Sequence, residues 1–349
     1  MAKGGSEVTV TSGGLNDDEW NTLLRRIHEG RCTPFIGPGA RAQMSDEEFK
    51  TLLARMKDDD APPIIGPGEP LRFPDAYRIT RAWADEYRYP LWDCLDLPKV
   101  ARYVSVKGDA ATPKEKIVEL HKKIGRPEFG DESNRDDPHR VLAGLPFPIY
   151  ITTNQDAFMY DALVSRGKSP ERDLCRWSEK IPKNPPSVFD RRRNPPYAPH
   201  RATPLVFHLY GHTDSLQSLV VSDDDYIEFL INVSKYKNRV PPQIEGVMSG
   251  AALMLLGYRL DDWDFRVLFH ILIGFKSLGM THVAVQLSPA ENESARALEE
   301  RVIKHLEVYQ TYVGEYFLSK NLKIRVVPQT CKEFVLALRD KWERSSYAD

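Results

Sequence analysis

The stretch "CTPFIGPGA", Cys32–Ala40, predicts a buried strand that ends in a tight turn, because a short apolar run breaks directly into two glycines around a proline. The segment just before it, "NDDEWNTLLRRIHEG", predicts an amphipathic helix over about residues 16–29. Apolar residues recur there at helical spacing between Trp20 and Ile27, after a capping candidate at Asn16. The fold is therefore expected to begin with a helix and a strand.

Further short apolar runs follow along the chain, and segments with helical patterns separate them. They span residues 147–152, 204–210, 253–257, 282–287 and 322–327. Buried strands that alternate with helices indicate a mostly parallel sheet covered on both faces. The predicted fold class is α/β, a Rossmann-like doubly wound sheet.

The long interval between the first two predicted strands contains no comparable apolar run. It holds a proline- and glycine-rich loop, "DDDAPPIIGPGEPLRFP", and then helical patterns such as "TPKEKIVELHKKIG". We interpret residues 42–138 as a mainly helical subdomain inserted into the sheet domain. Residues 1–15 are expected to form a flexible leader, and residues 16–349 a single domain that includes the insertion.

Composition argues against several partners. The 48 Lys and Arg nearly balance the 50 Asp and Glu, so no basic field attracts nucleic acid or an anionic membrane. No apolar run approaches the ~18 residues of a membrane span, and a cytoplasmic protein is expected. The cysteines stand singly and include no CxxC pair, which predicts neither a zinc ribbon nor a disulfide framework, and no metal is expected.

Three predicted strand ends carry candidate binding residues. Gly37-Pro38-Gly39 would let the backbone approach a phosphate closely, although an ordinary tight turn explains the pattern equally well. Asn154 and Asp156 follow the 147–152 strand, where they would point toward a ligand or simply cap the next helix. Gly257 ends another strand and would let a ligand lie against the backbone.

The stretch "PLVFHLYGHTDS" places His208, Tyr210 and His212 around Gly211. In a strand, side chains two residues apart share a face, so His208 and Tyr210 are expected to point to the same side. His212 is expected just past the turn.

Together, four blocks resemble the ordered signature segments of bacterial sirtuin-like domains of the type found in antiphage defence proteins. They are "FIGPGA", "PFPIYITTNQD", "FHLYGHTDSLQSLVVSDDDYIEFL" and "LLGYRLDDWDFRVLF". The resemblance covers about residues 18–345. It implies a Rossmann-type sheet with a helical module and NAD bound in the cleft between them.

The resemblance also implies roles for individual residues. It places the glycine turn by the pyrophosphate, Asn154 with Asp156 by the nicotinamide ribose, and Gly257 with Tyr258 on the adenosine side. The implied cofactor-binding residues are Gly37, Pro38, Gly39, Ala40, Thr153, Gly211, Gly257 and Tyr258.

Sirtuin deacylases carry a zinc ribbon with paired cysteines, which this chain lacks, and this argues against deacylation. The defence-associated relatives hydrolyse NAD to nicotinamide and ADP-ribose. The leading hypothesis is therefore an NAD+ hydrolase that depletes NAD as an antiphage effector. The alternative is a catalytically weak or inactive NAD or ADP-ribose sensor, or a partner subunit of a defence complex. A homo-oligomer, a second defence protein, or both are the expected partners.

The candidate catalytic residues are Asn154, Asp156, His208, Tyr210 and His212. NAD hydrolysis needs a base with a pKa near neutral, and histidine suits this best. The usual block of the family reads "LHG", whereas this chain reads "LYG" and places Tyr210 at the base position. Tyrosine, with a pKa of about 10, is a poor base at pH 7. The sequence leaves open whether His208 or His212 compensates, or whether His208 is a packed core residue in a site that only binds.

Overall fold

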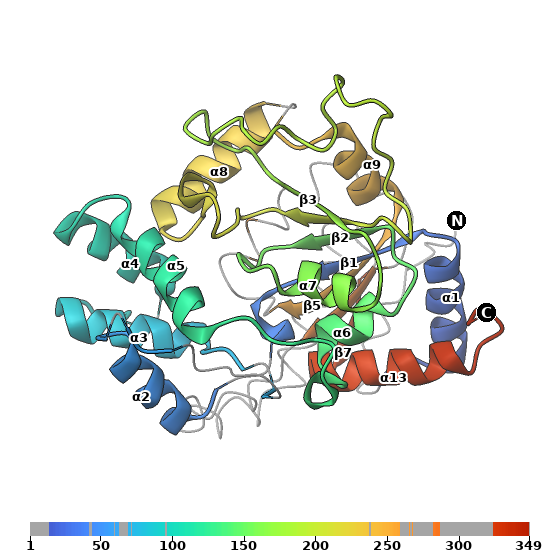
Figure 1. Ribbon diagram of the computed structural model, residues 1–349, viewed down its shortest axis with the longest axis horizontal. Coiled ribbons are helices and arrows are strands. Elements are labelled where there is room, and N and C mark those ends of the chain that lie inside the picture. The colour runs from blue at the N-terminus through green and yellow to red at the C-terminus, as the bar shows by residue number, and fades with distance from the viewer. Residues whose placement is uncertain are drawn as a thin grey trace, which may run out of the picture.

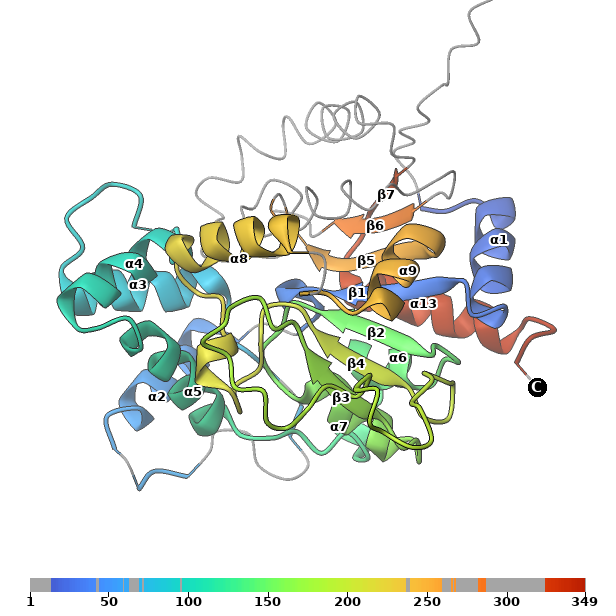
Figure 2. The ribbon, with the colours of Figure 1, turned by 90° about the horizontal axis from the view of Figure 1, so that it is seen from above.

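The computed structural model shows seven strands in one parallel sheet (Figures 1 and 2). It describes residues 14–41, 44–58, 60–62, 69–70, 72–94, 96–236, 239–258, 265, 267, 282–286 and 324–348. The strands are β1 (Cys32–Ile36), β2 (Ile149–Thr152), β3 (Glu171–Leu174), β4 (Leu205–His208), β5 (Ala252–Tyr258), β6 (His282–Gln286) and β7 (Ile324–Pro328). Their order in the sheet is β3-β4-β2-β1-β5-β6-β7, and each neighbouring pair is parallel.

Strand β1 lies where the strand order reverses. After β1 the chain builds one half of the sheet from β2, β3 and β4, and then returns to place β5 on the other side of β1. Ligands of open α/β sheets bind beyond the carboxyl ends of the strands at such a point. The topology therefore directs attention to the residues that follow β1, β2, β4 and β5.

Helices cover both faces of the sheet (Figure 2). On one face, Val206 and Leu256 share a hydrophobic cluster with, among others, residues of four helices. These are α1 (Asp17–His28), α6 (Pro138–Ala143), α7 (Phe158–Ser165) and α13 (Cys331–Glu343). On the other face, Phe207 and Leu255 pack with residues of α8 (Asp223–Lys235) and α9 (Pro242–Gly250). Alternate side chains of β4 and β5 thus pack into two separate hydrophobic cores, one on each face of the sheet.

Between β1 and β2, the described residues form helices and no strand. The α-helices before α6 are α2 (Asp46–Arg55), α3 (Ala76–Tyr87), α4 (Leu97–Lys107) and α5 (Thr112–Ile124). Figure 1 shows this group beside the carboxyl ends of the central strands, away from α1 and the C-terminus. The domain boundaries remain a prediction, and residues 1–13 of the predicted leader lie outside the described residues.

The predicted fold class is confirmed, and the predicted helix and six predicted strands are present. Helix α1 begins with a capping box, in which Asn16 and Glu19 each bond the other's backbone N–H. Strand β3, "ERDL", was not predicted, because three of its four side chains are charged and most are half-buried at the sheet edge. Among the described residues, no helix is long and apolar enough to cross a membrane.

The ends of β1 and β5 touch at their backbones. Gly37 N–H donates to the Leu256 carbonyl at 2.8 Å, and the turn Pro38–Ala40 follows as one turn of 3-10 helix. Gly257 adopts a φ of +72°, and a Cβ there would overlap the backbone of Gly39 and Ala40. A Cβ on Gly37 would lie 2.8 Å from the Tyr258 ring. Both glycines are therefore required by the packing of the two strand ends.

We expect Gly257→Ala to lower the free energy of unfolding by more than about 2 kcal/mol, because a left-handed φ and a backbone overlap act together. Gly30→Ala is the matched control, since Gly30 has a φ of +68° but nothing within 4 Å of an added Cβ. It should cost only the ~1 kcal/mol of the left-handed backbone. Urea unfolding of the two variants measures the difference, and equal losses would contradict the proposed overlap.

Candidate functional site

The carboxyl ends of β2 and β4 bring Asn154 and His208 together. Thr152 and His208 are register partners in the two strands, and Asn154 follows two residues after Thr152. His208 Nδ1 lies 3.0 Å from the backbone carbonyl oxygen of Asn154. A carbonyl oxygen only accepts, so Nδ1 carries the proton and the lone pair of the neutral ring is on Nε2. No described residue hydrogen-bonds this buried Nε2.

The side chain of Asn154 is oriented by the turn after β1. Its Nδ2 donates to the Gly37 carbonyl at 3.2 Å, and its backbone N–H donates to Thr152 Oγ1 at 2.9 Å. The carboxamide oxygen is buried and has no hydrogen-bond partner among the described residues. Two buried acceptors, this oxygen and His208 Nε2, thus follow neighbouring strands. Buried acceptors of this kind are normally satisfied, so a donor such as a water or a sugar hydroxyl fits here.

His212 packs beside His208, with ring centroids 4.7 Å apart in a T-shaped arrangement. Arg172 on β3 reaches His212 Nε2 at 2.8 Å and also pairs with Asp214 at 2.6 Å. The backbone N–H of Asp214 donates to His212 Nδ1 at 3.0 Å. A neutral ring accepts at one nitrogen only, so it can satisfy one of these two donors, whereas a protonated ring would oppose both and is disfavoured.

The pKa values of both histidines are lowered. Burial lowers the pKa of His208 to about 4, against a smaller opposing effect of its bond to Asn154. Burial, together with the proximity of His208 and the positive charge of Arg172, lowers the pKa of His212 far below its ordinary value. Both rings are therefore neutral at pH 7.

Asp156 forms a buried ion pair with Arg41 at 2.9 Å, and Arg41 lies 3.8 Å from the centre of the Phe73 ring. Burial alone would raise the pKa of Asp156, but Arg41 and the nearby His121 hold that pKa below its usual range. Asp156 also accepts from the Phe158 N–H at 3.0 Å, as a cap at the start of α7 would. The carboxylate is thus ionised and its structural role is evident.

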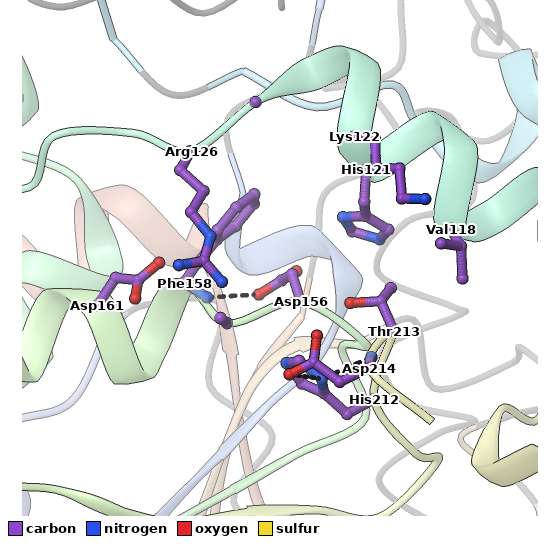
Figure 3. Close-up of a pocket in the computed structure, with 12 residues that line it drawn as sticks. Val118, His121, Lys122, Arg126, Asp156, Phe158, Asp161, His212, Thr213 and Asp214 are labelled. Atoms are coloured by element: carbon purple, nitrogen blue, oxygen red, sulfur yellow. Dashed lines mark hydrogen bonds and ion pairs between the residues drawn. The ribbon is translucent and has the colours of Figure 1, made fainter. Parts of the chain in front are cut away.

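A pocket of about 370 Å³ opens beside these residues (Figure 3). Its wall from the insertion is α5 and the residues after it, including His121 and Arg126. Its other wall includes Asp156, Asp161 and His212. His212 therefore lines the pocket, whereas Asn154 and His208 are not part of its lining.

The prediction that His208 and Tyr210 share a face is wrong. Strand β4 ends at His208, and the chain turns through Gly211, whose φ is +84°. Tyr210 consequently packs edge-on against Tyr226 and Phe229, in the core beneath α8. Tyr210 thus belongs to the opposite face of the sheet from the two histidines.

The predicted cofactor-binding residues gather at the same edge of the sheet. Gly37, Pro38, Gly39 and Ala40 form the turn after β1, and Gly257 lies against it. Tyr258 Oη is 3.0 Å from Thr153 Oγ1, so it joins the ends of β5 and β2. A Cβ on Gly211 would overlap Ser218. The protein's own packing accounts for these glycines, so their role in NAD binding remains a prediction.

Four pocket or site residues carry no motif and were missed by sequence reasoning. Arg41, His121 and Arg126 come from the turn after β1 and from the insertion, and Arg172 comes from the unpredicted strand β3. Only the folded chain brings them to Asp156 and His212. Across the described residues, no group of three or more His, Cys, Asp or Glu could hold a metal ion, and the four cysteines are free.

Residues 148–308 match the SIR2-like domain, a span that begins at β2 and includes Asn154 and His208. The chain contains a SIR2-like domain. The resemblance drawn from the sequence is thereby confirmed.

Two curated relatives of this SIR2-like chain are NAD(+) hydrolases named ThsA. The protein from Cytobacillus dafuensis is 22% identical over 183 residues, which cover 52% of this chain and 31% of that relative. The protein from Enterococcus faecium is 27% identical over 101 residues, which cover 29% of this chain and 18% of that relative. The matched region thus spans less than a third of either relative.

The buried His208 makes the stability of the domain depend on pH. Its pKa of about 4 lies below the ~6.5 of an unfolded histidine, so the unfolded chain binds the proton first as the pH falls. Stability from this group is complete above pH ~7 and is lost as the pH falls toward 4. We expect a loss of about 2 kcal/mol at pH 5 from this residue.

Urea unfolding at pH 7.5 and pH 5 measures this contribution. His208→Gln should lose about 2 kcal/mol less than the unsubstituted protein between the two pH values. His200→Gln serves as the control because His200 lies exposed in a loop, and it should follow the unsubstituted protein. An identical pH dependence in all three proteins would contradict the burial of a neutral His208.

Proposed function

We propose that this protein hydrolyses NAD to nicotinamide and ADP-ribose, with His208 as the general base and Asn154 as the residue that orients water or ribose. The observation that carries the proposal is the pair of buried acceptors, His208 Nε2 and Asn154 Oδ1, at the ends of adjacent strands. The names of the two ThsA relatives support the reaction.

The chemistry assigns a task to each residue. The bond between C1′ of the ribose and the nicotinamide nitrogen breaks, and its electron pair neutralises the pyridinium ring. A water oxygen bonds to C1′, and His208 Nε2 accepts the proton that the water releases. Asn154 Oδ1 accepts a hydrogen bond from the water or from a ribose hydroxyl without adding charge. Asp156 is already paired with Arg41, so we assign it the structural role of joining the turn after β1 to the start of α7.

His208→Gln and Asn154→Ala are expected to reduce nicotinamide release from NAD by roughly 10²- to 10⁴-fold, the usual worth of a positioned base. Tyr210→Phe should retain activity within about threefold, because the ring packs beneath α8 and away from His208. His200→Ala, in the exposed loop, is a second control. Mass spectrometry of an NAD incubation measures all four variants. Loss of activity in Tyr210→Phe alone would reject His208 as the base.

The pH profile provides an independent check on the base. Because burial lowers the pKa of His208 to about 4, the ring is in its basic form throughout the neutral range. The value of kcat/KM should be flat between pH ~6 and ~8 and fall as the pH drops below ~5. An activity that instead rises steeply between pH 8 and pH 10 would indicate a tyrosine base.

Binding without turnover is the second candidate function, and the surroundings of His208 and Tyr210 favour it. His208 is only 1% exposed and its lowered pKa makes it a weak base, while Tyr210 points elsewhere. Saturable binding of NAD or ADP-ribose with no nicotinamide release would establish this sensor or partner function in place of hydrolysis.

The resemblance to antiphage sirtuin-like proteins extends the proposal to the cell. We propose that the domain acts as a defence effector that depletes NAD, assembled with copies of itself or with a second defence protein. Bacteria that express the unsubstituted protein should lose NAD during phage infection, and bacteria that express Asn154→Ala should not. Equal NAD levels in both would exclude depletion as its mode of action.

A further inference from the structure

Helix α5 of the helical insertion turns one face toward the pocket and the sheet domain. Lys114, Val118, His121 and Gly125 recur along this face at helical spacing. The last three line the pocket, and Lys114 lies about two turns before His121 on the same face. A shift of α5 relative to the sheet would therefore change the pocket directly.

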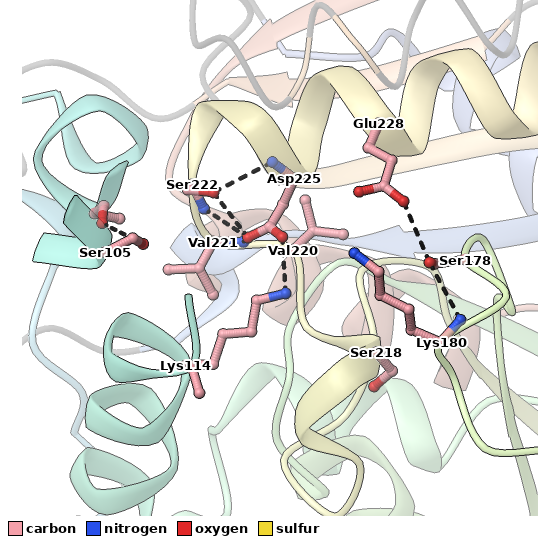
Figure 4. Close-up of polar contacts among 12 residues, drawn as sticks. Ser105, Lys114, Ser178, Lys180, Ser218, Val220, Val221, Ser222, Asp225 and Glu228 are labelled. Atoms are coloured by element: carbon pink, nitrogen blue, oxygen red, sulfur yellow. Dashed lines mark hydrogen bonds and ion pairs between the residues drawn. The ribbon is translucent and has the colours of Figure 1, made fainter. Parts of the chain in front are cut away.

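Lys114 is joined to the sheet domain by an ion pair (Figure 4). Its Nζ lies 2.7 Å from Asp225 Oδ1 in the first turn of α8, and the two side chains are only 12% and 13% exposed. The same Nζ lies 5.7 Å from the centre of the Trp177 ring. Arg102 on α4 also pairs with Asp223 on α8, but half of the Arg102 side chain is exposed, so this contact is weaker.

Asp225 in turn holds the end of the loop that carries His212, residues 209–222. Its Oδ2 accepts from the backbone N–H of Val221 at 3.1 Å and from that of Ser222 at 3.0 Å. The carboxylate thus satisfies Lys114 with one oxygen and the loop backbone with the other. An ionised acceptor in this position makes strong hydrogen bonds with both.

Hydrogen bonds within the loop connect the residues held by Asp225 to His212. Val220 N–H donates to the Tyr210 carbonyl at 3.1 Å, and Ser218 Oγ accepts from the His212 N–H at 3.0 Å. Gln155, on the segment between β2 and α7, donates from Nε2 to the Val220 carbonyl at 2.9 Å. A displacement of Val221 would therefore also shift the backbone at His212.

We propose that Lys114 is a positioning residue, which pairs with Asp225 to hold the α5 wall of the pocket against the loop that carries His212. The ion pair connects the two walls of the pocket: Lys114 belongs to the α5 wall, and Asp225 holds the loop whose His212 lines the other wall. The effect of Lys114 on activity rests on the proposed NAD hydrolysis, whereas its effect on the position of the loop does not.

Lys114→Met tests the proposal, because it keeps the length of the side chain and removes its charge. Lys116→Met is the matched control: Lys116 is on the same helix and pairs at 2.8 Å with Glu86, which also belongs to the insertion. Lys114→Arg preserves the charge. Asp225 is left in place in all three variants, because its bonds at the start of α8 would confound the result.

Hydrogen–deuterium exchange of the full-length protein gives the structural readout. Lys114→Met should speed exchange in residues 209–222 by at least about fivefold, since local opening follows the loss of an anchor. Lys116→Met should leave that segment unchanged. In the NAD assay, Lys114→Met should raise KM about tenfold with a smaller change in kcat, and Lys114→Arg should restore KM to within about threefold.

Each outcome decides the proposal. Unchanged exchange in residues 209–222 of Lys114→Met overturns it, whatever the activity. Faster exchange with an unchanged KM shows that the ion pair anchors the loop without positioning the pocket, and this also overturns it. If the unsubstituted protein releases no nicotinamide, the proposed function fails, and the exchange comparison with Lys116→Met decides the role of Lys114 alone.

Discussion

The backbone contact between the ends of β1 and β5 is the constraint on which the site depends. Gly257 can lie against Gly39 and Ala40 only because it has no side chain and adopts a left-handed φ. This contact fixes the turn after β1, whose Gly37 carbonyl then orients the Asn154 carboxamide. The approach of two parallel strands where the strand order reverses thus determines where one candidate catalytic side chain points. The glycines serve this packing whether or not a phosphate also lies against them.

The polar groups beyond this contact divide into satisfied and unsatisfied sets. Asp156 is neutralised by Arg41, and His212 is held between Arg172 and the backbone of Asp214. His208 Nε2 and Asn154 Oδ1 have no partner within the described chain. Unsatisfied buried acceptors cost free energy, so they are better explained by a ligand than by the fold. His139 Nε2 and Asp161 Oδ2 are also without a partner among the described residues, but only His208 and Asn154 follow the ends of adjacent strands.

The sequence predicted an element correctly where the element has a regular pattern of buried residues. Strands buried on both faces, such as β1 and β5, are continuous apolar runs, and α1 carries its capping box in its own sequence. Strand β3 was missed because edge strands carry polar side chains that read as loop. The orientation of Tyr210 was predicted wrongly because strand periodicity was extended past His208, where the chain had already turned.

The α/β class, the helices between the first two strands and the resemblance to sirtuin-like domains could all be read from the amino-acid sequence, because they follow from local periodicity and short motifs. Three contacts became visible in the folded chain alone: His208 lies beside Asn154, Arg172 contacts Nε2 of His212, and Lys114 pairs with Asp225 at the start of α8. These contacts join residues far apart in the chain, and they depend on strand register, turn geometry and burial. No local pattern encodes those three properties together.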